Sequence, residues 1–245
     1  MSSGATLRGR LVSLLPGSLR RRLRPNAIPR HGAVDLGDLR RGRPISRHFG
    51  YERGLPVDRY YIERFLDANQ TDIRGRVLEV GDAAYTARFG GQRVTRSDVL
   101  HVPPGTPEAT IVADLASGDS IPGDAFDCIV LTQTLHLIFD VPAAVATLHR
   151  ILADGGVLLA TAPGISQIER GQWRDTWYWS FTVPSMTRLF AERFGLDNID
   201  VSASGNVLSA VAFLEGLAAD ELREDELLPY DEAYPVTVAV RAVKG

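Results

Sequence analysis

The sequence contains very little cysteine and lysine and has no long apolar run. Its 245 residues include one cysteine, Cys128, and one lysine, Lys244. A single cysteine cannot form an internal disulfide, which excludes a disulfide-stapled fold and fits a reducing cytoplasm. No window of about 18 consecutive apolar residues occurs, so no membrane-spanning helix is predicted. Apolar residues make up 44% and charged residues 23%, and we therefore expect an ordinary globular, cytoplasmic protein.

Charge is distributed unevenly along the chain. Residues 1–45 carry ten arginines and two aspartates, a net charge of +8, whereas residues 215–232 carry eight acidic residues and one arginine, a net charge of −7. A basic segment can contact an anionic membrane surface or nucleic acid. The alternative, which we favour over a nucleic-acid partner, is a solvated segment or one that docks on the acidic stretch. Residues 1–45 are therefore interpreted as a basic N-terminal extension.

Short apolar runs alternate with helical patterns from about residue 58 onward. Apolar strands separated by helices predict an α/β fold, a parallel and doubly wound sheet with helices on both faces. Ligands of such sheets bind beyond the carboxyl ends of the strands. The expected strands are Arg76–Val80, Arg93–Asp98, Ala109–Ala113, Phe126–Leu131 and Val157–Ala162, and an amphipathic helix is expected over Val141–Leu152.

Three of the expected strand ends carry groups that suit a nucleoside. Gly81 follows the first strand, where a glycine lets a ligand approach the backbone closely. Asp98 ends the second strand, placed to bind the two hydroxyls of a ribose. Asp114 follows the third strand, where a carboxylate can accept a hydrogen bond from an adenine amine. Each acid alone could instead form a turn or cap a helix, but together they suggest an adenosine site.

The motifs between about Asp72 and Gly164 resemble those of class I S-adenosylmethionine-dependent methyltransferases. They include Val-Leu-Glu-Val-Gly at 77–81, Ala-Asp-Leu at 113–115 and the helix-to-strand passage at 148–159. The resemblance implies a Rossmann-like, mostly parallel sheet with an antiparallel last strand, and S-adenosyl-L-methionine as the cofactor. The implied cofactor contacts are Glu79 and Gly81 with the methionine portion, Asp98 with the ribose, Asp114 and Leu115 with the adenine, and Asp82, Val99 and Gln133 elsewhere around the cofactor.

The glycine loop departs from the pattern of the family. The family motif is usually E-x-G-x-G-x-G, and Ala83 and Tyr85 replace the later glycines here. The Tyr85 ring could pack over the cofactor or fill its place. Asp82 could attract the cationic sulfur or cap the next helix. This departure leaves a second interpretation open, a methyltransferase-like fold that binds a ligand or catalyses another reaction without methyl transfer.

His136 lies just beyond the fourth strand and is the candidate general base. An imidazole titrates near neutral pH and can take a proton from an alcohol nucleophile. The alternative is a structural histidine at the start of a helix. Hard metal ions need several oxygen ligands, and Thr132, Gln133 and residues 162–164 do not supply such a set beyond the fourth and fifth strands. We therefore expect no metal.

Two aromatic segments, residues 47–61 and 173–182, could form a lid over the acceptor. The arginines and tyrosines of the first could cover the cofactor carboxylate. The tryptophans of the second could simply pack over the sheet edge, or they could hold a sugar or a flat ring. The expected reaction is therefore O-methylation of a bacterial sugar or secondary metabolite, a small-molecule acceptor. The candidate acceptor contacts are Tyr51, Arg53, Trp173, Asp175 and Trp177.

The end of the chain differs from a minimal methyltransferase. Residues 198–204 and 236–243 are expected to form the last two strands, with an apolar helix at 205–218 between them that Asn206 could cap. Because this helix is apolar on most faces, we expect it to be buried. It could cover the sheet, line an acceptor pocket or form a homodimer interface. Residues 46–245 are thus interpreted as a methyltransferase-like domain with a helical insertion at about 205–232.

Overall fold

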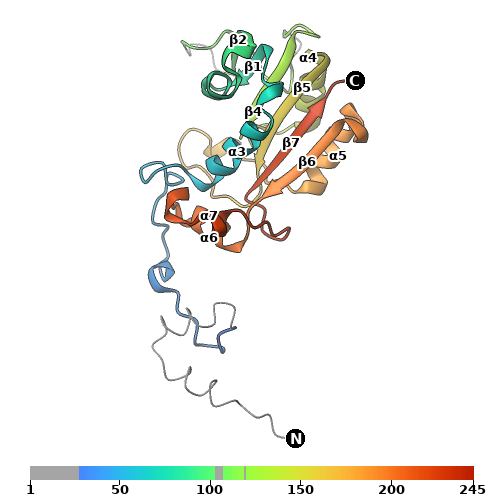
Figure 1. Ribbon diagram of the computed structural model, residues 1–245. Helices are drawn as coiled ribbons and strands as arrows, with labels where there is room; N and C mark the ends of the chain where they lie inside the picture. The colour runs from blue at the N-terminus through green and yellow to red at the C-terminus, as the bar shows by residue number, and fades with distance from the viewer. Residues whose placement is uncertain (1–27, 103–106, 119) are drawn as a thin grey trace, which may run out of the picture. The chain divides into compact units, whose positions relative to one another are not determined.

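The computed structural model describes residues 28–102, 107–118 and 120–245. Contacts divide the chain between Gly42 and Arg43. In the first unit, the described residues include a short 3-10 turn at Gly37–Leu39. Much of the predicted basic extension, residues 1–27, lies outside the described residues. Every other element that we describe belongs to residues 43–245 (Figure 1).

A seven-stranded sheet forms the centre of the described part of residues 43–245, with the order β3-β2-β1-β4-β5-β7-β6. Strands β1 to β5 pair in parallel. Strand β7 runs antiparallel to both of its neighbours, β5 and β6. This confirms the predicted mostly parallel, doubly wound sheet with an antiparallel last strand. The strands are β1 (Gly75–Val80), β2 (Val94–His101), β3 (Ile111–Val112), β4 (Phe126–Thr132), β5 (Leu152–Pro163), β6 (Ile199–Ser204) and β7 (Thr237–Val243).

Helices cover both faces of the sheet (Figure 1). On one face, α4 (Val141–Ile151) and α5 (Val183–Phe194) share a cluster of buried side chains with Leu78 of β1. On the other face, α3 (Val57–Ala68) packs against Val77. Neighbouring residues of β1 are therefore buried in two different hydrophobic clusters, one on each face of the sheet, because successive side chains of a strand point to opposite faces. Burial of these side chains by helices on both sides explains why the strands read as continuous apolar runs.

Helix α4 forms where its apolar periodicity predicts, and local chemistry fixes its start. The Asp140 carboxylate accepts a hydrogen bond from the Ala143 N–H at 3.1 Å, and a proline stands in the first turn. The chain enters β5 directly after Ile151, so this strand begins five residues earlier than the predicted Val157. Gly155 lies inside this longer β5 with φ of 73°.

Two helices, α6 (Val207–Glu215) and α7 (Glu224–Leu227), stand between β6 and β7. The predicted cap of α6 is confirmed, because the Asn206 side chain accepts hydrogen bonds from the backbone N–H groups of Leu208, at 3.0 Å, and Ser209, at 3.1 Å. The Tyr61 hydroxyl of α3 donates to the Leu227 carbonyl at 2.9 Å and ties α7 to the domain. Phe213 of α6 is buried in the cluster shared with α3.

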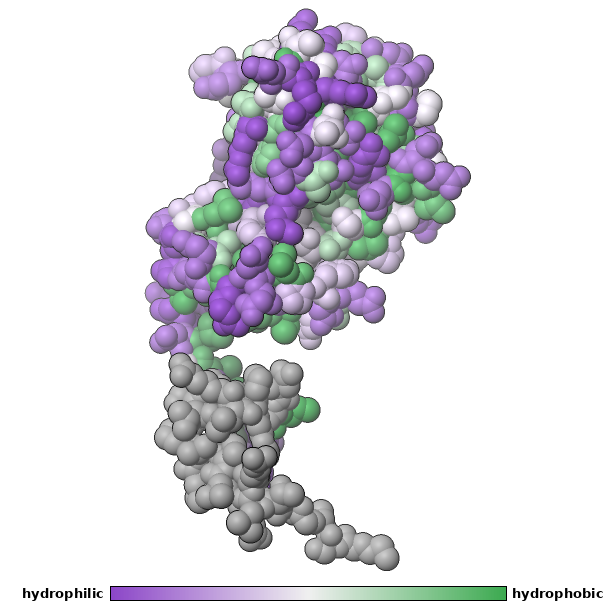
Figure 2. Space-filling view, viewed as in Figure 1, coloured by the Kyte–Doolittle hydropathy of each residue, from purple (hydrophilic) through white to green (hydrophobic). Residues whose placement is uncertain are grey.

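The surface of residues 43–245 is mostly polar on the face shown in Figure 2, with smaller apolar patches between the polar side chains. The expectation that α6 is buried on most faces is wrong for one side, where four apolar side chains are at least 36% exposed. These are Val207, Leu208, Val211 and Leu214. None of the described helices has the length and apolar character needed to cross a membrane.

Candidate active site

The turn after β1 lies at the point where the winding of the sheet reverses, since β1 pairs with β2 on one side and with β4 on the other. Gly81 adopts φ of 101°, a conformation that disfavours any residue with a Cβ. A Cβ added there would meet no atom within 4 Å. The backbone of Gly81 therefore borders open space, and the backbone angle is what demands glycine.

The Glu79 side chain stabilises this turn through hydrogen bonds to its backbone. Its side chain is 2% exposed, and its carboxylate accepts hydrogen bonds from the backbone N–H groups of Tyr85, at 3.2 Å, and Thr86, at 2.7 Å. Burial raises the pKa of Glu79 above its usual value, although the hydrogen bonds from Thr86 and Tyr85 oppose that shift. The carboxylate thus fixes the loop that follows Gly81.

The loop after Gly81 contains Asp82 and Tyr85, whose side chains lie in different surroundings. The Tyr85 ring lies 6.0 Å from the Phe89 ring, centroid to centroid, in the cluster beneath α3. Since nothing lies within 4 Å of a Cβ at Gly81, the tyrosine ring does not close that space. Asp82 is exposed, and its carboxylate accepts the Ala84 N–H at 2.8 Å. This hydrogen bond closes a local turn and is not the predicted helix cap, because the N-cap of the next helical segment is Tyr85.

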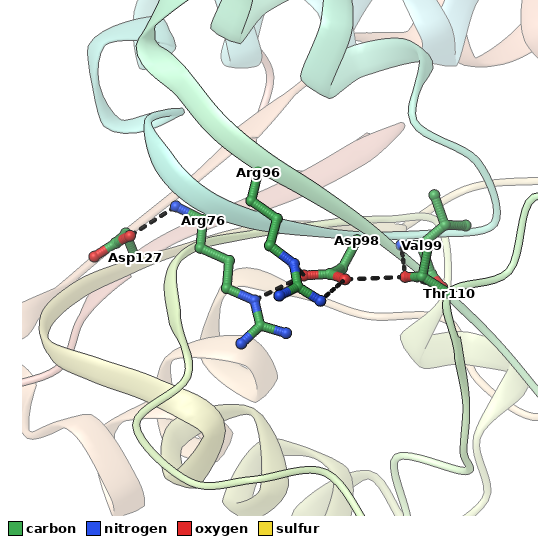
Figure 3. A network of polar contacts seen from close by, with 6 residues as sticks. All are labelled: Arg76, Arg96, Asp98, Val99, Thr110 and Asp127. Atoms are coloured by element: carbon green, nitrogen blue, oxygen red, sulfur yellow. Dashed lines mark hydrogen bonds and ion pairs between the residues drawn. The ribbon is translucent and has the colours of Figure 1, made fainter.

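Asp98 does not end its strand, and that prediction is wrong. Strand β2 continues to His101, and the Asp98 side chain is only 2% exposed. Figure 3 shows its carboxylate held between Arg76 and Arg96, with Nε of Arg76 at 2.7 Å and a terminal nitrogen of Arg96 at 3.1 Å. The Thr110 hydroxyl donates to the same carboxylate at 3.2 Å. Both carboxylate oxygens therefore have partners within the protein.

Electrostatics keep the Asp98 carboxylate charged in this setting. Burial alone would raise its pKa, but hydrogen bonds from Arg76 and Arg96 outweigh burial and hold the pKa below its usual value. Val99, a predicted cofactor contact, is 5% exposed and donates its N–H to the Thr110 hydroxyl at 2.9 Å (Figure 3). At the true end of β2, the His101 ring instead contacts the Gly81 carbonyl.

Asp114 and Leu115 follow β3 in contrasting environments. Asp114 is exposed, and one carboxylate oxygen accepts the Ala116 N–H at 2.8 Å. Leu115 is 1% exposed and belongs to the core. The Asp114 carboxylate therefore remains open to a ligand at the strand end, while Leu115 anchors the turn.

A cavity of about 340 Å³ lies beyond the ends of β4 and β5. Its wall combines residues before α3 and in the first turn of α3, residues after β4 and β5, and Phe213 of α6. Five predicted site residues are brought together in this wall: Tyr51, Gln133, His136, Trp173 and Trp177. Two others are not, because Arg53 pairs with Glu221 and Asp175 lies in the exposed 3-10 turn Arg174–Thr176.

Aromatic rings and strained backbone shape this cavity. The Trp177 ring stacks on Phe49, with centroids 6.2 Å apart and planes 13° apart, and lies 4.2 Å from the His136 ring. Phe49 and Gln133 both adopt positive φ, 58° and 46°, which residues with a Cβ rarely do. Such strained residues concentrate at functional sites.

His136 is 2% exposed, and its ring nitrogen Nδ1 has no hydrogen-bond partner. Burial lowers the pKa of His136 to about 3, with a further contribution from the charge of Arg59. The imidazole is therefore neutral over the range in which most enzymes work. This corrects the expectation that it titrates near neutral pH, which holds only for a solvated histidine.

The sequence did not single out several residues of the cavity wall, among them Asp58, Arg59, Glu169 and Phe213. Asp58 is buried and lies in the first turn of α3, which starts at Val57. Burial raises the pKa of Asp58. Arg59 donates from Nε to the Tyr51 hydroxyl at 2.8 Å. The only sequence feature that could have indicated Arg59 as a site residue is its position in the aromatic segment 47–61.

Comparison with known proteins decides the family. Residues 60–201, more than half of the chain, match the family model described as a methyltransferase domain. The chain belongs to this methyltransferase family. The predicted resemblance to class I S-adenosylmethionine-dependent methyltransferases is confirmed, and S-adenosylmethionine is the methyl donor of that class. A search of curated proteins gave no match.

Solved structures show the same fold. An S-adenosylmethionine-dependent methyltransferase from Archaeoglobus fulgidus has a TM-score of 0.50 at 9% identity, over 76% of this chain and 94% of the other. The N-methyltransferase NodS from Bradyrhizobium japonicum, in complex with S-adenosyl-L-homocysteine, has a TM-score of 0.50 at 14% identity, over 79% of this chain and 90% of the other.

The strand ends of this methyltransferase fit S-adenosylmethionine except at the ribose. Gly81 borders open space, Asp114 presents an exposed carboxylate, and the side-chain nitrogen of Gln133 is buried without a partner. These groups suit the methionine and adenine portions. Asp98 does not suit the ribose, because two arginines already hold its carboxylate. Within the described residues, no three His, Cys, Asp or Glu side chains gather as a metal site would require.

Proposed function

We propose that this methyltransferase transfers a methyl group from S-adenosylmethionine to a hydroxyl oxygen of a small acceptor, a sugar or a secondary metabolite, bound in the cavity beside His136. The observation that carries the proposal is the cavity of about 340 Å³, which combines aromatic walls with a buried histidine whose Nδ1 lacks a partner. Aromatic walls combined with convergent polar groups are typical of small-molecule sites.

Each residue has a distinct part in the proposal. Bound S-adenosylmethionine supplies a methyl group on a cationic sulfur, already activated for displacement. Gly81 allows the cofactor to approach the backbone, and Asp114 accepts a hydrogen bond from the adenine amine. The neutral His136 ring accepts a hydrogen bond from the acceptor hydroxyl and orients its oxygen. As the methyl group is transferred and S-adenosylhomocysteine leaves, the ring takes the hydroxyl proton and passes it to solvent. Trp177 restricts the plane of the acceptor. Alignment of this kind can supply several kcal/mol of rate enhancement.

The proposal includes metal independence and a cytoplasmic location. The Glu169 carboxylate of the cavity wall is already hydrogen-bonded within the protein, because its two oxygens accept backbone N–H groups from Gly171 and Trp173. It is therefore not free to bind a metal ion. The only cysteine, Cys128, is fully buried in β4 and needs no oxidising compartment.

A specific observation favours one alternative function. Because Asp98 is held by Arg76 and Arg96, the domain could bind a ligand without methyl transfer. Calorimetric titration of the full chain with S-adenosylhomocysteine separates the two functions. We expect saturable binding and a raised melting temperature. No heat and no thermal shift would overturn the methyltransferase proposal and favour the alternative.

A further inference from the structure

We propose that Arg59 and Gln133 form a subsite for a carboxylate group of the bound ligand. The inference rests on the proposed function only in that the ligand occupies the same cavity. Two sources of the carboxylate fit the geometry, the amino-acid end of S-adenosylmethionine and a carboxylate on the acceptor itself. The shared chemistry is an anionic group with two oxygens.

Two arginines line the cavity, Arg47, which is exposed, and Arg59, which is partly buried. Arg59 is the one whose charge is held within the wall. Its side chain is 24% exposed, and of its guanidinium nitrogens only Nε has a partner, the Tyr51 hydroxyl. Within the described part of the chain, no hydrogen bond or ion pair reaches either terminal nitrogen. Those two nitrogens form the planar fork that binds a carboxylate with two parallel hydrogen bonds.

The carboxylates of the cavity wall do not occupy this fork. The closest approach of Asp58 to the guanidinium is 4.0 Å, to Nε, and its other oxygen accepts the backbone N–H of Arg59 at 2.8 Å. Glu169 uses both oxygens on its own turn, at 2.6 and 2.9 Å. A carboxylate from a ligand is therefore the complement that the cavity lacks.

Gln133 gives a second, independent sign of a ligand. Its side-chain nitrogen is buried without a hydrogen-bond partner. Burial of an unpaired donor destabilises the folded protein unless another group supplies an acceptor. Its backbone is held at φ of 46°, and its N–H donates to the Thr161 carbonyl at 2.9 Å, so β5 fixes the strained conformation. Strain retained beside an unsatisfied donor is expected where a ligand supplies the missing acceptor.

The test uses two pairs of probes that differ in a carboxylate. The first pair is S-adenosylmethionine and decarboxylated S-adenosylmethionine. The second pair is 4-hydroxybenzoate and its uncharged amide, 4-hydroxybenzamide, which suit the aromatic wall. Calorimetry on the full chain measures each affinity for the wild type and for Arg59→Met. We expect the variant to lose about 30-fold in affinity for the carboxylated member of one pair and less than about threefold for its partner.

Two further variants guard the interpretation. Arg53→Met removes an arginine of the same segment that pairs with Glu221 outside the cavity, and it should leave all four affinities unchanged. Gln133→Glu keeps the size of the side chain but places an internal carboxylate in the cavity that Arg59 also lines, where it competes with the carboxylate of the ligand. It should reproduce the selective loss. Circular dichroism and melting temperature check that each variant is folded.

The outcomes separate the source and the two proposals. Selective loss in the first pair assigns the subsite to the cofactor, and selective loss in the second assigns it to the acceptor. Binding of the second pair alone, with selective loss in Arg59→Met, would sustain the subsite while the methyltransferase proposal fails. The subsite is overturned if neither carboxylated probe binds the wild type, or if Arg59→Met changes the two members of each pair alike.

Discussion

Replacement of His136 by glutamine should remove a large part of the acid sensitivity of the folded protein. The pKa of His136 is about 3 in the folded state because burial disfavours the charged ring, whereas a histidine in the unfolded chain titrates near about 6.5. Between these values the unfolded chain binds a proton that the native protein does not. The free energy of unfolding therefore falls as the pH drops below about 6.5.

The magnitude follows from the width of that window. Each pH unit between the two pKa values costs up to about 1.4 kcal/mol, so a change from about pH 7.5 to about pH 5 should cost roughly 2 kcal/mol through His136 alone. Urea denaturation at both pH values measures the loss. His136→Gln should lose about 2 kcal/mol less than the wild type over this interval, since every other titrating group is shared.

A neighbouring variant serves as the control. Trp177→Phe disturbs the ring that lies 4.2 Å from His136 but removes no titrating group. It should lower stability at both pH values by a similar amount. If His136→Gln and the wild type lose the same free energy between the two pH values, the buried, neutral histidine is refuted, and a solvated base would again be the better interpretation.

Three other outcomes are expected. Asp98→Asn should destabilise the fold by about 2 kcal/mol, because Arg76 and Arg96 lose a charged partner. The same variant should change the affinity for S-adenosylhomocysteine less than about twofold, and a large loss of affinity in calorimetry would show that Asp98 binds the ribose after all. Gly81→Ala should cost about 1 kcal/mol in urea denaturation through its positive φ and weaken cofactor binding; unchanged binding would place the cofactor elsewhere. EDTA should leave methyl transfer unchanged, and activity that EDTA abolishes and magnesium restores would contradict metal independence.

The mostly parallel, doubly wound sheet was predictable because local pattern and tertiary environment agree. Continuous apolar runs such as Phe126–Leu131 are buried on both faces, and the periodicity of Val141–Leu152 matches the buried side of α4. Strand length was less predictable. The residues after Asp98 continue β2 because they pair with β1 as far as Val80 and Leu100, a long-range contact that no local signal marks.

The site was predictable in its strand-end residues and less so in its electrostatics. The place of His136 after β4 follows from the motif, but its lowered pKa depends on burial by Trp177 and on the charge of Arg59, which come from distant segments. One of the two partners of Asp98 was hidden for the same reason. Arg96 lies two residues before Asp98 on β2 and therefore on the same face, but only the pairing of β1 with β2 brings Arg76 to the same carboxylate.

A crystal structure of the full chain with S-adenosylhomocysteine tests the central claim most directly. We predict density that runs from the open side of Gly81 toward Asp114, with Asp98 still bound to Arg76 and Arg96 and with space left beside His136 and Trp177 for an acceptor. Density confined to the aromatic cavity, or none at saturating ligand, would contradict a methyltransferase that binds its cofactor at the strand ends.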